Sequence, residues 1–272
     1  MRPVTQVGRT QPTQKGNFMR TSFGLLGLSL AAVASPAFAE DTAPPPAVTI
    51  NGTAAIVSDY RFRVISQSNK RFAVQGSITA THKSGVYGSV WASSIDDYIT
   101  SNPGSPGSDQ EIDLIAGFKK TFGGTTLDVG ATYYYYAGHT DFANTDFIEP
   151  YIALSHSIGP VTAKGTIFYA PKQKALAFAN NKDDNLYGAI DLSASIPNTP
   201  VALSAHLGHN FERSFLSLGT KYTDWSVGAT YTYKALTFGI SYVDTNTTAF
   251  SGIPTSRNIT KGGVLGSITA SF

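Results

Sequence analysis

The chain contains no cysteine among its 272 residues, which excludes disulfide bonds, thiolate nucleophiles and Cys-ligated metals. Charged residues are also scarce, at 14% of the chain, whereas an average soluble domain has about 25%. A chain with so little charge must keep much of its surface out of water. Yet no segment after residue 40 has the roughly 18–20 unbroken apolar residues that a membrane-spanning helix needs. The two shortages together favour a membrane barrel, whose strands present only every second residue to lipid.

A basic surface is missing as well. The formal charge of +2 arises from the first 39 residues, which contain four bases, Arg2, Arg9, Lys15 and Arg20, and no acid. The remaining chain has 16 basic and 18 acidic residues, a net charge of −2. Because it has no basic stripe with interleaved aromatic residues, we expect no nucleic-acid partner.

The N-terminal segment has the layout of a secretory signal peptide. A basic region precedes an apolar run over 23–34, and Ala37-Phe38-Ala39 matches an A-x-A cleavage site before Glu40. At about twelve residues, the run is too short to span ~30 Å of hydrocarbon as a helix. We therefore predict a cleaved signal peptide over 1–39 and a short N-terminal tail over 40–48.

From residue 48 onward, apolar and polar residues alternate with a period of two, which is typical of β-strands with two different faces. In the clearest stretch, Leu127, Val129 and Ala131 share one face, whereas Asp128 and Thr132 share the other. The pattern predicts twelve strands, at 49–61, 72–82, 86–94, 111–120, 125–136, 146–157, 161–170, 185–196, 200–208, 223–233, 236–244 and 262–272.

The connections between these strands alternate strictly in length. Five are tight, at 83–85, 121–124, 158–160, 197–199 and 234–235, and six are long, at 62–71, 95–110, 137–145, 171–184, 209–222 and 245–261. Up-and-down barrels show this alternation because their turns gather at one end and their loops at the other. We therefore predict an all-β fold: a transmembrane antiparallel up-and-down β-barrel of about 12 strands over 49–272, embedded in outer-membrane lipid, with short periplasmic turns and long extracellular loops.

Aromatic residues support the same interpretation. Eight of them lie on apolar strand faces, where a ring can mark the membrane interface: Phe72, Tyr133, Tyr135, Tyr169, Tyr231, Tyr233, Phe238 and Tyr242. The chain ends in Phe272 on an alternating strand, which resembles the signal read by the barrel assembly machinery of bacterial outer membranes. It departs from that signal at Ala270, where a second aromatic residue is usual.

The exit of the first predicted strand carries a recognisable motif. It reads Ser58-Asp59-Tyr60-Arg61-Phe62-Arg63-Val64-Ile65-Ser66-Gln67-Ser68 and closely resembles the opening motif of the TorF porin family, S-D-Y-R-F-R-G-I-S-Q-S. Blocks similar to later parts of that family follow at 73–78, 88–94, 111–114 and 222–225. The resemblance runs from about residue 50 to the C-terminus, and it implies an outer-membrane channel without indicating a solute. Val64 replaces the family's glycine, so we expect the tight turn there to be relaxed.

Charged side chains on the predicted strands fall opposite the apolar face. A charge facing lipid near mid-membrane costs ~2–4 kcal/mol, so these side chains should face the lumen. The candidates for pore lining or constriction are Asp59, Arg61, Arg63, Glu111, Asp113, Lys119, Asp128, Glu149, Lys164, Asp191, His206 and Asp224. They either tune ion passage or pair with one another and fill a narrow interior, since eight-stranded barrels fill with side chains and sixteen-stranded barrels leave a channel.

Two features are expected to narrow such a pore. Asp59, Arg61 and Arg63 should project inward together near the outer rim, as an electrostatic constriction, a loop anchor or an ordinary salt-bridged strand end. By its length and its Gly and Pro content, the connection 95–110 is the first candidate for a loop that folds into the pore.

Passive diffusion of small polar solutes or ions is the leading functional hypothesis. The alternative is a closed structural or adhesion barrel that binds an external partner through its loops. An enzyme is not expected, because G-x-S-x-G is missing and a shared face of Ser204 and His206 is a chance pattern in Ser-rich strands. We expect no cofactor and no metal, since His206-x-x-His209 has no third ligand nearby and the acidic loop 141–146 lacks the Gly and Glu of an EF-hand.

Overall fold

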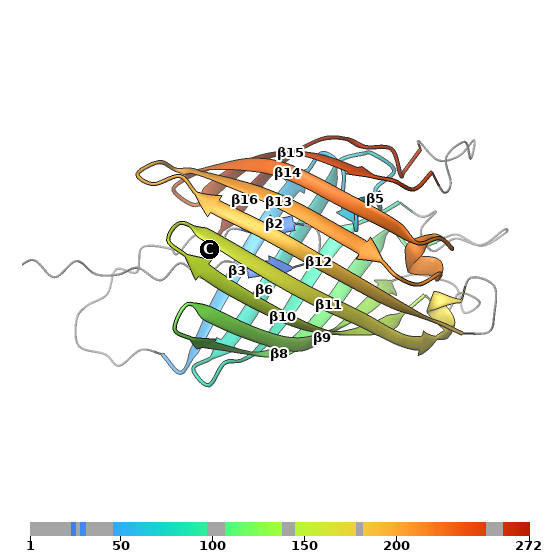
Figure 1. Ribbon diagram of the computed structural model, residues 1–272, viewed down its shortest axis with the longest axis horizontal. Coiled ribbons are helices and arrows are strands. Elements are labelled where there is room, and N and C mark those ends of the chain that lie inside the picture. Colours follow the sequence, from blue (N-terminus) through green and yellow to red (C-terminus); the bar gives the residue numbers. More distant parts are fainter. Residues whose placement is uncertain are drawn as a thin grey trace, which may run out of the picture.

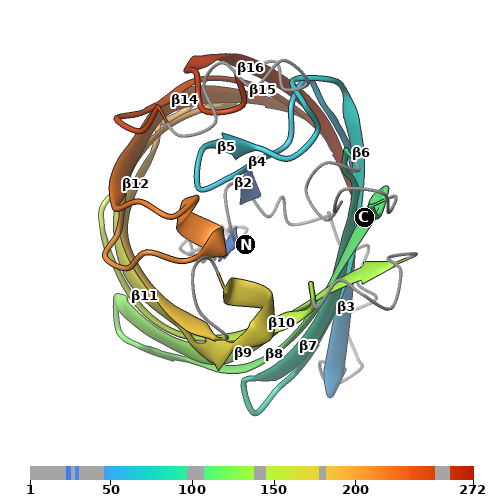
Figure 2. The same cartoon turned by 90° about the vertical axis from the view of Figure 1, so that its right-hand side faces the viewer.

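The computed structural model describes residues 46–96, 107–137, 145–177, 182–248 and 258–272, together with the backbone of 23–25 and 28–30. Twelve of its strands form one closed antiparallel barrel, which we call the wall (Figures 1 and 2). Each wall strand pairs with the next one along the chain, and the last pairs with the first. The predicted up-and-down barrel of twelve strands is confirmed.

The wall strands agree closely with the predicted ones. They are β3 (Val48–Val57), β6 (Ala73–His82), β7 (Val86–Ser94), β8 (Gln110–Phe122), β9 (Thr125–Ala137), β10 (Phe147–Ile158), β11 (Val161–Gln173), β12 (Asp183–Ser195), β13 (Val201–Asn210), β14 (Tyr222–Tyr233), β15 (Leu236–Thr245) and β16 (Gly263–Ser271). The barrel closes where β16 pairs with β3, and the amide of Phe272 donates to the carbonyl of Gly52 at 3.0 Å.

Turns and long connections lie at opposite ends of the wall, at the left and right of Figure 1. Each of the five tight turns contains one residue with positive φ. This backbone conformation allows the chain to reverse direction within two or three residues. Three of these residues are glycines, and the other two are Asn198 (φ 62°) and Lys234 (φ 54°). We refer below to the turn half and the loop half of the barrel.

Successive side chains of the wall point alternately outward and inward. On β14, for example, Val227 is 57% exposed on the outer face, whereas Asp224 faces inward and is fully buried. All eight aromatic residues predicted on the apolar face are exposed on the outside of the barrel. An outer face of apolar and aromatic side chains suits hydrocarbon, and it leaves the polar residues of each strand to the interior.

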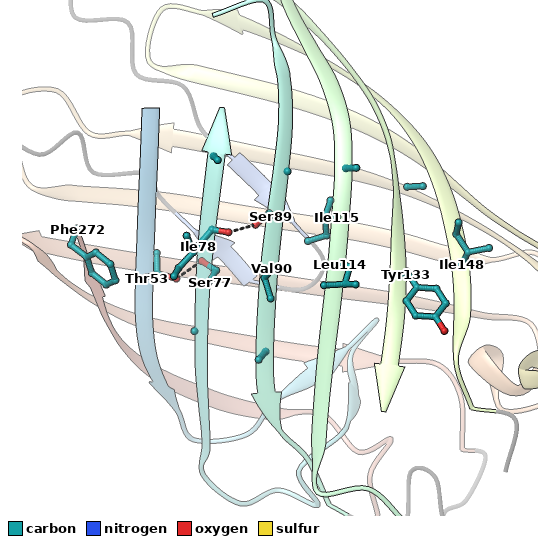
Figure 3. A pocket seen from close by; sticks show the side chains of 16 residues that line it. Thr53, Ser77, Ile78, Ser89, Val90, Leu114, Ile115, Tyr133, Ile148 and Phe272 are labelled. Carbon is teal, nitrogen blue, oxygen red and sulfur yellow. Dashed lines mark hydrogen bonds between the residues drawn. The ribbon is translucent and has the colours of Figure 1, made fainter. Parts of the chain in front are cut away.

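The outer face is not smooth. Ala80, Gly88, Ala116 and Ala131 pair in register across β6–β9 and form the floor of an open apolar groove of about 1050 Å³. The next row toward the loop end is bulky and stands beside that floor, as Figure 3 shows: Ile78, Val90, Leu114, Tyr133 and Ile148. This groove lies on the lipid-facing side of the wall and is separate from the lumen.

The first long connection folds into the barrel. β3 ends at Val57, and residues 58–72, which we call the inner hairpin, contain the short strands β4 (Arg61–Phe62) and β5 (Ile65–Ser66). Figure 2 shows both strands inside the ring of the wall. Residues 59–69 are all buried. The prediction that the first strand continues to residue 61 was therefore wrong, and the segment predicted as a surface loop occupies the lumen.

The turn of the inner hairpin is tight. Arg63 (φ 47°) and Val64 (φ 66°) are its two central residues, and positive φ at both is the signature of a type I′ turn. The expectation that Val64 relaxes this turn was wrong, because the ladder from Arg61 to Ser66 keeps the turn closed with valine in a conformation that favours glycine.

Two short 3-10 helices, η2 (Lys174–Leu176) and η3 (Phe215–Ser217), also lie at the loop end, over the interior (Figure 2). They join the inner hairpin in an apolar cluster within the barrel, with the partly buried Trp91, Ala175 and Leu216 at its edge. Its buried members are Val57, Tyr60, Phe62, Ala73, Ile95, Tyr134, Tyr136, Phe147, Ala170 and Leu176. The loop half thus has a packed core of its own.

Two predicted features lie in segments of which the structure describes only a part. Within residues 1–45, the structure describes only β1 (Phe23–Leu25) and β2 (Leu28–Leu30), which pair antiparallel, so the cleaved signal peptide stays a prediction. Residues 97–106 of the connection expected to fold inward lie outside the described residues. Within the described part of the chain, no helix is long and apolar enough to cross a membrane.

Candidate functional site

The inner hairpin is organised by a buried acid. Asp59 accepts a hydrogen bond from Nε of Arg61 at 2.7 Å and others from the hydroxyls of Ser66 at 2.6 Å and Ser68 at 3.2 Å. The guanidinium of Arg61 also donates to the carbonyl of Val64 at 2.9 Å. These bonds satisfy polar groups that burial would otherwise leave unpaired. They make the segment a self-contained unit.

One ion pair fastens this unit to the opposite wall. Nη2 of Arg63 donates to both carboxylate oxygens of Glu149 on β10, at 2.6 and 2.7 Å, and the two side chains are 2% and 0% exposed. The guanidinium also lies over the rings of Tyr187 and Phe168, with 4.2 and 5.6 Å to the ring centres. Burial lowers the pKa of Arg63, but the charge of Glu149, the rings of Tyr134 and Tyr187 and the hydrogen bond to Glu149 together raise it more, and the net pKa lies above its usual value. The guanidinium therefore stays charged.

Further contacts hold the hairpin from its sides. Arg61 donates to the carbonyls of Ile259 at 3.2 Å and Lys261 at 3.1 Å, and the amide of Ser66 donates to Ile259 at 3.1 Å. The amide of Asp96 donates to the carbonyl of Gln67 at 2.8 Å. The hairpin therefore bridges the space between distant parts of the loop end.

A pair of acids lies behind the hairpin without a basic partner. Glu111 and Asp113 face inward from β8 and are 1% and 4% exposed. The hydroxyl of Tyr60 donates to Oε1 of Glu111 at 3.3 Å, whereas Oε2 of Glu111 and Oδ1 of Asp113 have no hydrogen bond. Among the described residues, neither acid has a Lys, Arg or His within ion-pair distance. Gln75 and Thr132 on nearby strands also have unpaired buried oxygens.

Charges of both signs alternate around the middle of the wall. Nζ of Lys119 lies 3.1 Å from Oδ2 of Asp128, whose other oxygen accepts a bond from Tyr87 at 2.8 Å. Farther round, Lys164 and Asp191 are register partners on β11 and β12. The four charged side chains of this belt are only partly buried and remain open to the interior of the barrel.

His206 completes the belt on β13. Its Nδ1 lies 2.7 Å from Asp191, and its Nε2 lies 3.0 Å from both Asp224 and the hydroxyl of Tyr187. A histidine between two carboxylates is well placed to hold a proton as a fixed charge. No serine hydroxyl is among the partners recorded for His206 in the described residues, and no group of three or more His, Asp or Glu there has the arrangement of a metal site.

The turn half is lined by hydroxyl groups instead. Pairs of them are hydrogen-bonded across neighbouring strands, as between Thr121 and Thr126 at 2.9 Å or Thr232 and Thr237 at 3.1 Å. Most of these inward residues are partly exposed. Hydroxyls donate and accept hydrogen bonds equally well, so this part of the lumen can be wet without favouring one sign of charge.

All twelve predicted lining residues face the interior. Nine lie on the wall as the alternation predicted: Glu111, Asp113, Lys119, Asp128, Glu149, Lys164, Asp191, His206 and Asp224. Asp59, Arg61 and Arg63 come together within the inner hairpin and not on a strand at the rim. Sequence reasoning missed the rings that surround Arg63 and the acids. Tyr134 could have been found, since it shares the inward face of β9 with Asp128.

The chain is similar to one protein family and to outer-membrane barrels of known structure. Residues 40–272 match the model of a family described as "Bacterial protein of unknown function (Gcw_chp)", and no curated protein sequence matches. Among solved structures, the NanC porin has a TM-score of 0.52 at 12% identity, over 82% of this chain and 99% of that chain. Outer membrane phospholipase A from Escherichia coli scores 0.47 at 13% identity, over 81% of this chain and 92% of that one. An outer membrane channel from Pseudomonas putida F1 scores 0.47 at 11% identity, over 84% and 96%. The likeness to NanC shows a shared barrel fold.

Proposed function

The chain belongs to the Gcw_chp family of bacterial proteins, and we propose that it is an outer-membrane channel for passive diffusion of small polar solutes or ions. Its passage is the lumen of the barrel, narrowed at the loop end by the inner hairpin. No energy source or cofactor is needed for such transport. The resemblance to the TorF porins agrees with this proposal.

The observation that carries the proposal is the contrast between the two faces of the wall. Outside, the exposed side chains are large and apolar, as at Ile240 and Val227. Inside, the belt and the turn half have partly exposed charges and hydroxyls, such as Lys119 and Thr232. An interior meant only to be filled would gain more from apolar packing, whereas polar groups left open to water suit a wet passage.

The packing of the loop half favours a second candidate. The inner hairpin, η2 and η3 form a buried core there, which is what a closed barrel that binds an external partner through its loops would need. The two candidates differ in whether solutes pass.

Reconstitution into planar bilayers separates them. For a channel we expect steady ohmic current steps, together with swelling of reconstituted liposomes in small sugars. The Val227→Arg variant, which puts a charge on the lipid face, is the control for insertion and should fail to assemble. Folded barrel that inserts but shows neither current nor swelling would contradict the channel and favour the closed barrel.

A further inference from the structure

The inner hairpin is held in place with strained backbone. Arg63, Val64, Asn69 and Lys70 all have positive φ, between 47° and 66°. Valine in this region is an outlier because its branched Cβ clashes with the backbone. Residues in such conformations persist only where the surroundings impose them, and they are common in segments that switch between two states.

The closed packing also leaves polar atoms without partners. Nε and Nη1 of Arg63 on the hairpin, and oxygens of Gln75, Glu111, Asp113 and Thr132 on the wall behind it, are buried and make no hydrogen bond. Each of these groups would be hydrated if the hairpin moved away. The closed arrangement therefore combines strong fastenings, such as the pair of Arg63 with Glu149, with features that favour release.

We propose that the inner hairpin is a gate, and that its release uncovers an acidic wall which makes the open lumen selective for cations. This inference rests on the proposed channel and names the class of solute that it prefers. Two independent observations support it: the strained, incompletely bonded seat of the hairpin, and the charges that stay behind when the hairpin leaves.

The charge balance follows from which residues belong to which part. Asp59 and Arg61 are paired within the hairpin and would leave together, which changes nothing on the wall. Arg63 would leave with them, as would Lys70 and Arg71 at the end of the hairpin, whereas Glu149, the partner of Arg63, stays on β10. Glu149 then joins Glu111 and Asp113, so three carboxylates face the emptied loop half. In the belt below, Lys119 and Asp128 remain paired and contribute no net charge.

A cysteine under the gate can report its release, since the chain has no native cysteine. Ser93 on β7 is 3% exposed and pairs in register with both Gln75 and Glu111. The full chain with Ser93→Cys, reconstituted in liposomes, is treated with a trimethylammonium methanethiosulfonate or with its sulfonate counterpart. A matched cysteine at Thr81, next to the turn end of β6, controls for access to the lumen.

We expect slow labelling of the cysteine at 93, faster with the cationic reagent than with the anionic one. Adding Glu149→Gln should speed the labelling about tenfold or more, the scale expected when a buried charge loses its partner. The cysteine at 81 should react at one rate in both backgrounds. Equal rates at 93 with and without Glu149→Gln would overturn the gate, and equal rates for the two reagents would overturn the selectivity.

Reversal potentials in a KCl gradient provide a second readout. The double variant Glu111→Gln/Asp113→Asn should lose most of the cation preference, whereas Asp244→Asn, the same chemistry on the outer face, should keep it. An unchanged preference in the double variant would overturn the acidic wall. A barrel that never conducts but whose labelling responds to Glu149→Gln would refute the proposed channel and support the gate. A conducting barrel with unresponsive labelling would refute the gate alone.

Discussion

The two halves of the lumen are built from different chemistry. In the loop half, aromatic rings and fully buried ion pairs pack around the inner hairpin, and Glu149 and Asp224 have no exposed surface. In the turn half, small hydroxyl residues such as Thr81 and Thr232 remain partly open. One strand supplies both kinds of surface, since β8 carries Glu111 near its loop end and the hydroxyl of Thr121 at its turn end. The same strands therefore form both halves. The interior is packed where the hairpin fills it and partly open where it does not.

The largest effect should come from removing the fastening of the hairpin. Glu149→Ala leaves the charge of Arg63 buried without a partner, which typically costs about 3–5 kcal/mol. We expect the hairpin to leave the lumen while the barrel stays closed. The ring centres of Trp91 and Tyr60 are 5.3 Å apart, so Trp91 becomes more exposed to water when the hairpin leaves, and its fluorescence emission should shift to the red. The measurement is made with Trp225→Phe, which leaves Trp91 as the one tryptophan. Ser155→Ala, in the turn half of the same strand, should leave the emission unchanged; a shift there as well would erase the contrast between the halves.

Neighbouring tyrosines on β9 test the core of the loop half. Tyr134 is 1% exposed and stacks on Phe147 at 4.2 Å, whereas Tyr133 is 39% exposed on the outside. Tyr134→Ala should lower the free energy of unfolding by about 3 kcal/mol, as for other large-to-small core changes. Tyr133→Ala should lower the free energy of unfolding by clearly less. Urea unfolding from lipid vesicles gives both values, and equal losses would show that the interior is not packed.

Two inward serines compare a buried position with a partly open one. Ser66 is fully buried, donates to Asp59 at 2.6 Å and accepts from the amide of Lys70 at 2.9 Å. Ser66→Ala should cost about 1–3 kcal/mol, because it leaves these groups without a partner. For Ser77→Ala, where water can replace the lost hydroxyl, we expect the free energy of unfolding to fall by less than about 0.5 kcal/mol. The same unfolding assay measures both, and a larger loss at Ser77 would reverse the comparison.

The smallest effect concerns the turn of the hairpin. At most sites glycine is less stable than alanine by about 0.5–1 kcal/mol. At position 64 the order should invert, with Val64→Gly more stable than Val64→Ala by about 1 kcal/mol, because only glycine escapes the strain at φ 66°. Protection of the hairpin amides from hydrogen exchange provides the measurement. If Val64→Ala were more stable than Val64→Gly, the turn would not be strained.

The sequence was sufficient to predict the wall because a two-residue period specifies both strand and face. On β14, Trp225, Val227 and Tyr231 fix the outward side, so the inward position of Asp224 follows. The same rule failed at residues 58–61, since Asp59 and Arg61 continue the alternation beyond Val57, where the strand ends. Val64 hid the turn signal that a glycine would have provided. The pairing of Arg63 with Glu149 joins residues 86 positions apart, and no local pattern contains it.

The single-channel conductance of a barrel without its inner hairpin is the clearest test of whether the hairpin narrows a wet lumen. Val57 and Ala73 are register partners, so a short Gly-Ser turn can replace residues 59–69 without opening the wall. We predict a folded barrel with larger ohmic steps than the wild type and a preference for cations. Steps of the same size in both proteins, or no current from either, would contradict a wet lumen that the hairpin narrows.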